Sequence, residues 1–198
     1  MLASGGCSGA CARPETQKDD QKQKFGVFCL TVSDRAAKGL YETGDLSGKA
    51  MAECVSQMAG EHLELAGSKI VVDEKEKIQA AILEALAAPD SNIRLILTSG
   101  GTGFAPRDVT PEAVSELFVR HADSLNQMMQ SEALKVTPMA CLSRSVIGMV
   151  PCTGGQGGQA LVVTLPGKPK AVKENFEILI RNRVLLHCLH QLRGEESH

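Results

Sequence analysis

The sequence predicts a three-layer α/β/α sandwich with a mainly parallel sheet. Apolar runs of strand length alternate with segments whose apolar residues recur at helical spacing, from Phe25 to Leu192. This alternation is typical of strand, helix, strand units and favours parallel strands. Polar and glycine-rich segments follow where several of the apolar runs end. Because the carboxyl ends of parallel strands meet at one edge of a sheet, we expect a ligand site at that edge.

The individual elements follow from the same patterns. The run from Phe25 to Ser33 is rich in β-favouring residues, which indicates a central strand buried on both faces. Thr110 and Pro111 predict a helix start with Thr110 as N-cap, and Asp73 is the expected N-cap of an earlier helix. The other expected strands are 63–72, 93–97 and 159–165, and the expected helices are 48–59, 73–88, 111–121, 124–135 and 170–192.

Length and composition indicate one water-soluble domain with short ends. The chain has 198 residues, of which 43% are hydrophobic and 22% charged, and no apolar run approaches the length needed to cross a bilayer. We expect the domain to span 25–193, between a disordered tail at 1–24 and a frayed end at 194–198. The net charge of −2, the absence of Trp and the single Tyr argue against a nucleic-acid partner.

Cysteine usage and the N-terminal tail favour a cytoplasmic protein. Seven cysteines without a C-x-x-C pair indicate reduced thiols, and those among apolar neighbours are expected to be small core residues. The tail lacks the apolar core of a secretory signal peptide, and its three acidic residues are unlike an organelle transit peptide. The cysteines expected in the core are Cys29, Cys54, Cys141 and Cys188.

A glycine-rich segment after the strand at 93–97 is the first candidate for a phosphate site. Glycine permits positive φ and close approach of the backbone to a ligand, and neighbouring N–H groups with hydroxyls suit phosphate oxygens. Glycine-rich turns between a strand and a helix also occur in α/β proteins that bind no ligand, so the glycines alone leave both interpretations open. The segment reads Thr98-Ser99-Gly100-Gly101-Thr102-Gly103.

Acidic residues follow other predicted strands or precede predicted helices, and we expect them to converge on the same sheet edge. Ser33 and Asp34 follow the first strand, Asp45 precedes a helix, and Asp73 follows the second strand. Carboxylates there suit Mg²⁺, which is commonly bound by one or two carboxylates together with substrate phosphates. A structural alternative for Asp45 is an acid at a helix N-terminus that complements the helix dipole.

Several of these segments carry more specific motifs. They are Thr31–Asp34, Asp45–Gly48, Val71–Glu74, Leu95–Glu112, Thr137–Arg144 and Pro166–Pro169. In unbroken order across about 25–192, they resemble the molybdopterin adenylyltransferase family, which includes the G-domain of gephyrin and its bacterial and plant relatives in molybdenum cofactor synthesis. Three departures are Val72 in place of a proline, Lys168 in place of an often small polar residue, and the glycine-rich 151–158, a predicted mobile surface insertion.

The resemblance implies a molybdopterin-binding-domain fold and a Mg²⁺-dependent reaction. In that reaction the terminal phosphate of molybdopterin attacks the α-phosphate of ATP, giving adenylyl-molybdopterin and pyrophosphate. Asp45 and Asp73 are the implied catalytic and metal-binding residues. The other implied residues are Gly100, Gly101, Thr102, Gly103, Ser33, Asp34 and Ser99 for the nucleotide, and Ser143, Arg144, Pro166, Gly167 and Lys168 for molybdopterin.

Two other functions are compatible with the same resemblance. A non-catalytic trimeric scaffold or molybdopterin-binding module of the gephyrin type keeps the fold alone, and a molybdopterin-binding relative that hydrolyses a nucleotide pyrophosphate is a third class. Retention of Asp45, Asp73 and the glycines favours catalysis, because a scaffold has no use for paired acids in a cleft. The family further implies a homotrimer and a molybdate-inserting partner or fused domain.

Overall fold

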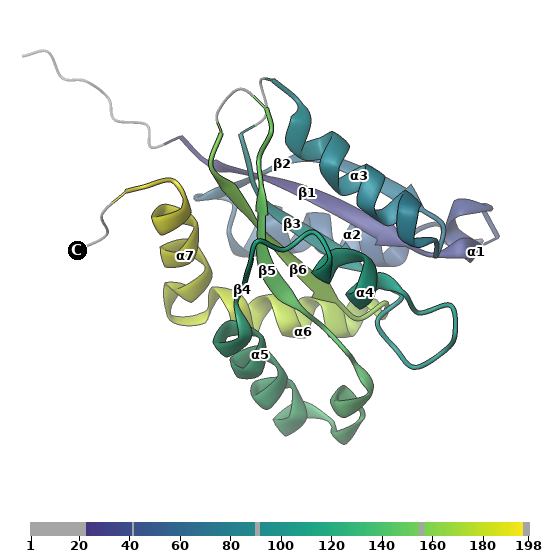
Figure 1. Cartoon of the computed structure of the whole chain (residues 1–198). Helices are drawn as coiled ribbons and strands as arrows, with labels where there is room; N and C mark the ends of the chain where they lie inside the picture. The colour runs from purple at the N-terminus through teal and green to yellow at the C-terminus, as the bar shows by residue number, and fades with distance from the viewer. Residues whose placement is uncertain (1–22, 41, 90–91, 155–156, 196–198) are drawn as a thin grey trace, which may run out of the picture.

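The chain folds around a six-stranded sheet with helices on both faces (Figure 1). A computed structural model describes residues 23–40, 42–89, 92–154 and 157–195. The strands are β1 (Phe25–Val32), β2 (Leu63–Val71), β3 (Ile93–Ser99), β4 (Arg120–His121), β5 (Ile147–Pro151) and β6 (Gln159–Leu165). The helices are α1 (Asp34–Ala37), α2 (Leu46–Glu53), α3 (Lys75–Ala87), α4 (Thr110–Ser115), α5 (Asp123–Val136), α6 (Pro169–Ile180) and α7 (Val184–Leu192). The predicted fold class is therefore confirmed.

The sheet brings the ends of three strands to one level. Its strand order is β2-β1-β3-β6-β5-β4. Strands β2, β1, β3 and β6 are parallel, whereas β5 is antiparallel to both β6 and β4. Thr31 pairs in register with Ser99, and Ser99 pairs with Leu165. The carboxyl ends of β1, β3 and β6 therefore lie side by side, and the glycine-rich segment begins there.

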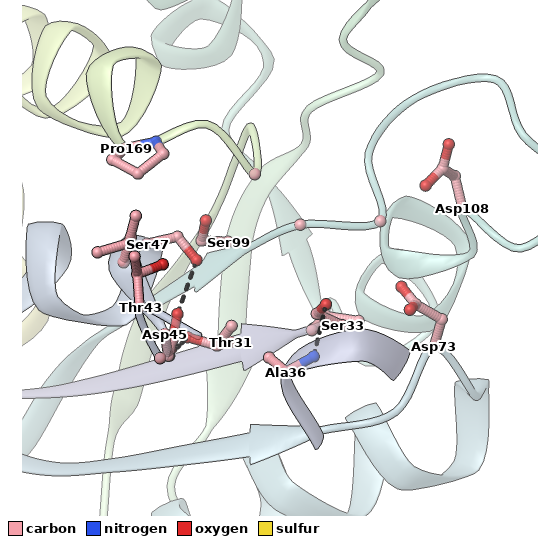
Figure 2. Close-up of a pocket in the computed structure, with 16 residues that line it drawn as sticks. Thr31, Ser33, Ala36, Thr43, Asp45, Ser47, Asp73, Ser99, Asp108 and Pro169 are labelled. Carbon is pink, nitrogen blue, oxygen red and sulfur yellow. Dashed lines mark hydrogen bonds between the residues drawn. The ribbon is translucent and has the colours of Figure 1, made fainter. Parts of the chain in front are cut away.

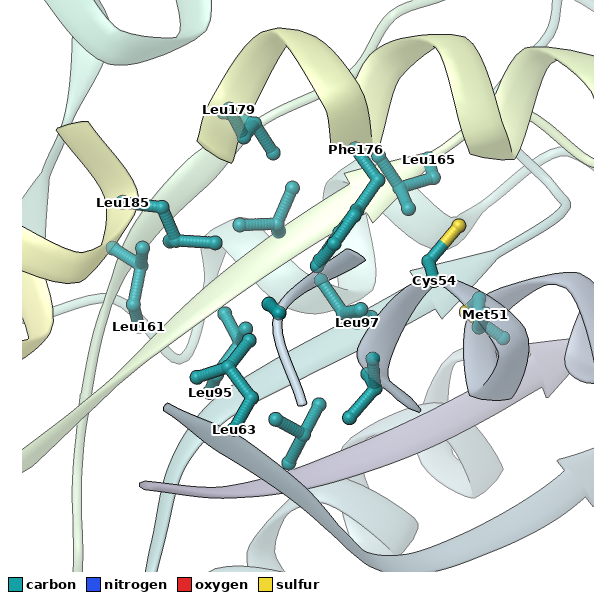
Figure 3. Packing of buried hydrophobic residues seen from close by; sticks show 14 of the residues in the cluster. Met51, Cys54, Leu63, Leu95, Leu97, Leu161, Leu165, Phe176, Leu179 and Leu185 are labelled. Atoms are coloured by element: carbon teal, nitrogen blue, oxygen red, sulfur yellow. The ribbon is translucent and has the colours of Figure 1, made fainter. Parts of the chain in front are cut away.

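Strand β3 divides the core into two apolar layers. All seven of its residues are buried. Leu95 and Leu97 pack with residues of α2, α5, α6 and α7, whereas Ile96 packs with residues of α3 and α4 on the opposite face. Figure 3 shows Phe176 of α6, which is fully buried, reaching toward Leu97. Burial of each such side chain stabilises the fold by about 1.5–3 kcal/mol, which holds the strand ends in place.

The single helix predicted over 170–192 is wrong. Helix α6 ends at Ile180, and a 3₁₀ turn separates it from α7. Within that turn Arg183 has a φ of 61°, in the left-handed region that L-residues rarely adopt. The break turns the chain so that Leu189 of α7 packs into the same core layer as Phe176 of α6. Apolar spacing continues through the break, so periodicity alone did not reveal it.

The helix predicted over 111–121 is also too long. Helix α4 ends at Ser115, and Arg120–His121 forms β4 against β5. Neither β4 nor β5 was expected from the sequence pattern. The Phe118 ring packs over Gly148 of β5 so closely that a Cβ at that glycine would lie 2.4 Å from the ring. This contact and the strand pairing draw the chain out of the helical path.

Two predicted helix caps are wrong. Thr110 is the first residue of α4, and Val109 occupies the N-cap position. At the start of α3, Glu74 occupies the N-cap position and its side chain makes no capping hydrogen bond. The Asp73 carboxylate instead accepts a hydrogen bond from the backbone N–H of Asp34, which belongs to a different element.

The helix predicted over 48–59 begins earlier and ends differently. Asp45 is its N-cap, and the carboxylate accepts the Gly48 N–H at 2.8 Å, so that α2 starts at Leu46. After α2 the chain continues as a π-helical turn at Cys54–Met58. The structural alternative for Asp45, an acid at a helix N-terminus, is thus confirmed as at least one of its roles.

The cysteines described by the structure are all free thiols. Cys29 and Cys54 are buried and Cys188 is partly buried, in line with the prediction. The prediction for Cys141 is wrong, because this residue is exposed on the 3₁₀ helix Pro138–Leu142, which has no buried residue. Burial raises the pKa of the Cys29 thiol to about 12.

The predicted ends of the domain are only partly covered by the structure. Of the predicted tail, 1–22 lies outside the described residues, as does 196–198 of the predicted frayed end. Gly194 and Glu195 donate backbone hydrogen bonds to carbonyls of α7. In the predicted insertion at 151–158, Pro151 belongs to β5 and 155–156 is not described. Across the described segments, no helix has the length and apolar content to cross a bilayer.

Candidate active site

Two cavities meet at the carboxyl ends of β1, β3 and β6. The first cavity, of about 350 Å³, lies between the end of β1, the segment before α2 and the glycine loop, by which we mean Gly100–Gly103. The second cavity, of about 620 Å³, lies between the glycine loop, α5 and the start of α6. Both are lined by Gly100, Gly101, Asp108 and Gly167. The glycine loop therefore forms part of the wall between two neighbouring binding spaces.

The conformation of the glycine loop requires glycine at its first two positions. Gly100 has a φ of 103°, and a Cβ there would lie 2.1 Å from the Val32 carbonyl oxygen. Gly101 has a φ of 61°, and a Cβ there would lie 2.3 Å from Thr110 Oγ1 and 3.1 Å from an oxygen of Asp73. A side chain at either position would displace the loop from β1 or from α4.

Backbone N–H groups of the glycine loop remain open to a ligand. The Gly100 N–H donates to the Leu165 carbonyl at 3.2 Å, which fixes the loop to β6. For Gly101, Thr102 and Gly103, no protein acceptor is found for the N–H within the described parts of the chain. Because Thr102 is only 5% exposed and buried N–H groups are rarely left unpaired, this arrangement suits an anionic ligand or water.

Asp73 lies beside the glycine loop, as the sequence analysis required. It lines the first cavity, and its carboxylate accepts the Asp34 N–H at 2.7 Å, while the Asp34 carboxylate accepts the Asp73 N–H at 3.2 Å. Burial raises the pKa of the Asp73 carboxyl, and the nearby Asp34 and Asp108 raise it further, although the Asp34 N–H and Arg107 oppose them. A cation would stabilise the charged form of this carboxyl.

Asp45 also lines the first cavity, but protein donors already contact both of its oxygens. One oxygen accepts the Thr31 hydroxyl at 2.6 Å, and the other accepts the Ser47 hydroxyl at 3.0 Å and the Gly48 N–H. Gly48 is required for this contact, because a Cβ there would lie 2.2 Å from the Asp45 carboxylate. Asp45 is thus held rigidly at the wall of the cavity.

The two acids occupy separate places on the first cavity. Figure 2 shows Asp45 beside Ser47, and Asp73 near Asp108, with Ser33 between the two places. Among the described residues, no group of three or more His, Cys, Asp or Glu side chains is arranged to hold a metal ion. The carboxylates present suit an ion such as Mg²⁺, which takes most of its ligands from phosphates and water. They do not form a closed metal site in which the protein supplies all of the ligands.

The hydroxyl residues predicted for the nucleotide line the first cavity and hold its wall. Ser33 Oγ caps α1 by accepting the Ala36 N–H at 3.2 Å, and Ser99 Oγ donates to the Pro166 carbonyl at 3.0 Å. Asp34 differs from them, because it contacts Asp73 and Arg107 and does not itself line the cavity.

Most of the residues predicted for molybdopterin line the second cavity. The Thr102 and Ser143 hydroxyls, on opposite segments, lie 3.3 Å apart. Lys168 occupies the N-cap position of α6 at the same cavity. Cavity-lining residues that the sequence analysis did not single out include Asn175 of α6, whose helical spacing gave no functional signal. The predicted residues that line the second cavity are Ser143, Pro166, Gly167 and Lys168.

Arg144 is placed differently from its prediction as a ligand contact. It does not line either cavity, and its donors bind the end of the glycine loop and the segment that follows it. Its N–H donates to the Thr102 carbonyl at 2.8 Å, Nε to Gly103 at 2.7 Å and Nη2 to Asp108 at 2.5 Å, and Nη1 pairs with Glu112. These contacts support a positioning role.

Replacement of Arg144 by Gln is expected to destabilise the protein by about 1.5–3 kcal/mol, since the charged donor is lost and backbone carbonyls of the loop are left unpaired. Chemical denaturation followed by circular dichroism measures this loss. The control is Arg181→Gln, which removes an arginine whose contact to Glu132 is a surface pair at 3.5 Å. Equal stability of the two variants would contradict the positioning role.

Asp108, which belongs to the Leu95–Glu112 motif, lines both cavities and was not among the predicted site residues. Its carboxylate accepts the Ala105 N–H at 2.9 Å, and a Cβ at Gly103 would lie 2.8 Å from the same oxygen. The signal that could have found it is its place in the loop that follows the glycines.

Together, the fold and this site define an α/β protein whose ligand site lies at the carboxyl edge of parallel strands.

Comparisons with known proteins identify the family. A family model described as a probable molybdopterin binding domain matches residues 28–186. Molybdopterin adenylyltransferase from Helicobacter pylori is 36% identical over 155 residues, which is 78% of this chain and 81% of that protein. The enzyme of the same name from Escherichia coli K12 is 34% identical over 76% of this chain and 71% of its own length. The chain belongs to the molybdopterin adenylyltransferase family.

Solved structures and larger relatives extend the comparison. The molybdopterin biosynthesis enzyme MoaB from Thermus thermophilus is 37% identical, with a TM-score of 0.70 over 88% of this chain and 99% of that one. Gephyrin from Dictyostelium discoideum is 35% identical over 84% of this chain but only 22% of its own length. The same fold thus occurs as a separate chain and as part of a longer protein.

Proposed function

We propose that this chain transfers the adenylyl group of ATP to molybdopterin in molybdenum cofactor biosynthesis. A phosphate oxygen of molybdopterin forms a bond to the α-phosphorus of ATP, the bond from that phosphorus to the bridging oxygen breaks, and pyrophosphate leaves. The observation that carries the proposal is that two cavities share the glycine loop. Such an arrangement lets two phosphorylated substrates meet at one place, and positioning supplies much of the rate in phosphoryl transfer.

The first cavity is assigned to the nucleotide phosphates. The unpaired N–H group of Gly101 lies at this cavity and suits phosphate oxygens, with Gly100, Ser33 and Ser99 forming the adjacent wall. The unpaired N–H groups of Thr102 and Gly103 belong to the same loop on the side of the second cavity, where a phosphate shared between the two cavities could reach them. Asp34 supports this site through Asp73.

The second cavity is assigned to molybdopterin. Lys168 offers a positive charge for its phosphate, and Ser143, Pro166 and Gly167 complete the wall on either side. Arg144 contributes by holding the glycine loop in place. A direct contact between Arg144 and the phosphate of molybdopterin stays a prediction from the sequence.

Asp73 and Asp45 are the proposed residues for a magnesium ion that arrives with the nucleotide. Bound Mg²⁺ supplies positive charge beside the phosphates and offsets the repulsion between two anionic substrates. Asp73 is the more direct ligand in this proposal, because it lies against the glycine loop and burial disfavours its uncompensated charge. Asp45 is held in a fixed position by three donors and binds at the other end of the same cavity.

A homotrimer, a cytoplasmic location and a molybdate-inserting partner or fused domain complete the proposal. The trimer and the cytoplasmic location rest on the sequence analysis. The partner or fused domain is supported by two longer relatives, gephyrin from Dictyostelium discoideum and the molybdenum cofactor synthesis protein cinnamon from Drosophila melanogaster, of which the matched region makes up 22% and 26%.

The test is incubation of the purified protein with ATP, Mg²⁺ and molybdopterin, with both pyrophosphate and adenylyl-molybdopterin measured. We expect the two products in equal amounts, and neither when molybdopterin is omitted. Pyrophosphate without adenylyl-molybdopterin would indicate nucleotide hydrolysis. Molybdopterin binding without either product would indicate a scaffold or binding module, and either result would overturn the proposal.

A further inference from the structure

Arg107 is a charged residue beside the first cavity to which the proposed reaction gives no role. It lies between the glycine loop and α4, and its Nη2 pairs with an Asp34 oxygen at 2.6 Å. The Arg107 side chain is 59% exposed and that of Asp34 is 29% exposed. The pair is therefore accessible to solvent, and breaking it costs little, since such pairs contribute about 0–1 kcal/mol.

Among the described residues that line the first cavity there are acids but no cationic side chain. Asp45, Asp73 and Asp108 line it, and no Lys or Arg is found among its described lining residues. A nucleotide triphosphate that enters such a space meets negative charge on the protein. The positive charge of Arg107 is next to this wall, because it acts on Asp73 and pairs with Asp34.

The contacts of Asp34 connect Arg107 to the centre of the proposed nucleotide site. Asp34 and Asp73 are joined by reciprocal hydrogen bonds of 2.7 and 3.2 Å between each backbone N–H and the carboxylate of the other residue. The remaining Asp34 oxygen is the one that binds Arg107. Any cation that binds at Asp73 thus approaches the guanidinium and repels it.

We propose that Arg107 is an exchangeable cation for the nucleotide: it pairs with Asp34 in the free protein and moves to a nucleotide phosphate when ATP binds. The planar guanidinium can form two parallel hydrogen bonds to a phosphate. This interaction is at least as strong as the solvent-exposed ion pair that Arg107 makes with the Asp34 carboxylate. The move supplies the positive charge that the first cavity lacks and leaves an Asp34 oxygen open beside Asp73. This inference rests on the proposed placement of the nucleotide in the first cavity.

The first test follows the guanidinium directly by ¹⁵N NMR of arginine side chains, without catalysis. The Arg107 Nε–H signal is assigned by its absence from Arg107→Gln. We expect this signal to shift when α,β-methylene-ATP is added, both with EDTA and with Mg²⁺. If the wild-type protein binds the analogue by calorimetry and the signal stays in place at saturation, the exchange is refuted while the nucleotide site stands. If the protein does not bind the analogue under either condition, the nucleotide site itself is refuted.

The second test measures affinity for the same analogue by calorimetry. We expect Arg107→Gln to bind about tenfold more weakly, as for loss of one charge-assisted hydrogen bond, and Lys38→Gln to stay within about twofold of the wild type. Lys38 is the matched control because it is exposed at the C-cap of α1 and its loss changes the net charge equally. Affinity unchanged by Arg107→Gln, or weakened equally by the control, overturns the proposal.

A double-variant cycle separates exchange from simple charge repulsion. Asp34→Asn releases Arg107 in advance, so we expect tighter binding of the analogue, by about threefold, when Arg107 is present. In the Arg107→Gln background the same substitution is expected to have little effect. Equal tightening in both backgrounds means that Asp34 only repels the nucleotide, which overturns the exchange.

Discussion

Replacement of Asp73 by Asn is expected to lower adenylyl transfer by about a hundredfold or more, while the protein stays folded. The carboxylate lies against the glycine loop, and its negative charge is what a bound cation would use. The measurement is the initial rate of pyrophosphate release at saturating ATP and molybdopterin. The control is Asp123→Asn, which removes an exposed acid at the start of α5 and is expected to keep the wild-type rate.

The folded state should tolerate Asp73→Asn for an electrostatic reason. The pKa of Asp73 is raised by folding, so the folded protein binds this proton more tightly than the unfolded chain. Asp73 therefore contributes its full stabilisation at pH values below its pKa in the unfolded chain. This stabilisation is lost as the pH rises through the pKa that Asp73 has in the folded protein. At neutral pH the partly buried charge is unfavourable, and an amide removes it while still accepting the Asp34 N–H. Thermal unfolding of Asp73→Asn at pH 7 should show a midpoint at or above that of the wild type. In the rate measurement, turnover by Asp73→Asn at the wild-type rate would contradict the metal role of Asp73.

Substitution of Gly101 by Val is expected to abolish ATP binding within the range of calorimetry. A Cβ would lie 2.3 Å from Thr110 Oγ1, and a β-branched residue at a φ of 61° is strained by about 1–2 kcal/mol. Because Thr110 begins α4 and is fully buried, the glycine loop must move instead. The unpaired N–H groups of the loop would then no longer point toward the nucleotide phosphates.

The matched control for this substitution is Gly157→Val. Gly157 has a similar φ of 55°, but a Cβ there would meet no atom within 4 Å. The control carries the same backbone strain away from the site, so it should lose some stability and keep ATP affinity. Unaltered affinity in Gly101→Val would count against the assignment of the glycine loop to the nucleotide, whereas lost affinity in both variants would point to general destabilisation.

The sequence predicted the parts of the fold that rest on local pattern. The strand at 159–165 matches β6 residue for residue, because a continuous β-favouring run ends at a Pro-Gly turn. The strand at 93–97 was correct in position, and the glycines after it mark a backbone that only glycine adopts. The convergence of Asp73 and Asp45 on one cavity followed from the shared edge of parallel strands.

Features decided by contacts between distant segments were not predicted. Strand β4 exists because Arg120–His121 pairs with β5, and Phe118 packs on Gly148, about thirty residues away in the chain. The left-handed Arg183 interrupts a pattern that remains apolar on one face, so periodicity could not locate the break. The same holds for Arg144, whose residue type suits a ligand contact equally well as the observed contacts to backbone carbonyls.

Three of the four residues that line both cavities are glycines, so the partition between the cavities carries little side-chain bulk apart from Asp108. Gly100 and Gly167 face each other there, and a Cβ on Gly167 would lie 3.4 Å from the Gly100 Cα. Between these two glycines, the partition is therefore only as thick as the main chain. If each cavity holds one substrate, the residue size tolerated at these two positions sets how closely the substrates approach, so even a methyl group would act as a spacer between them.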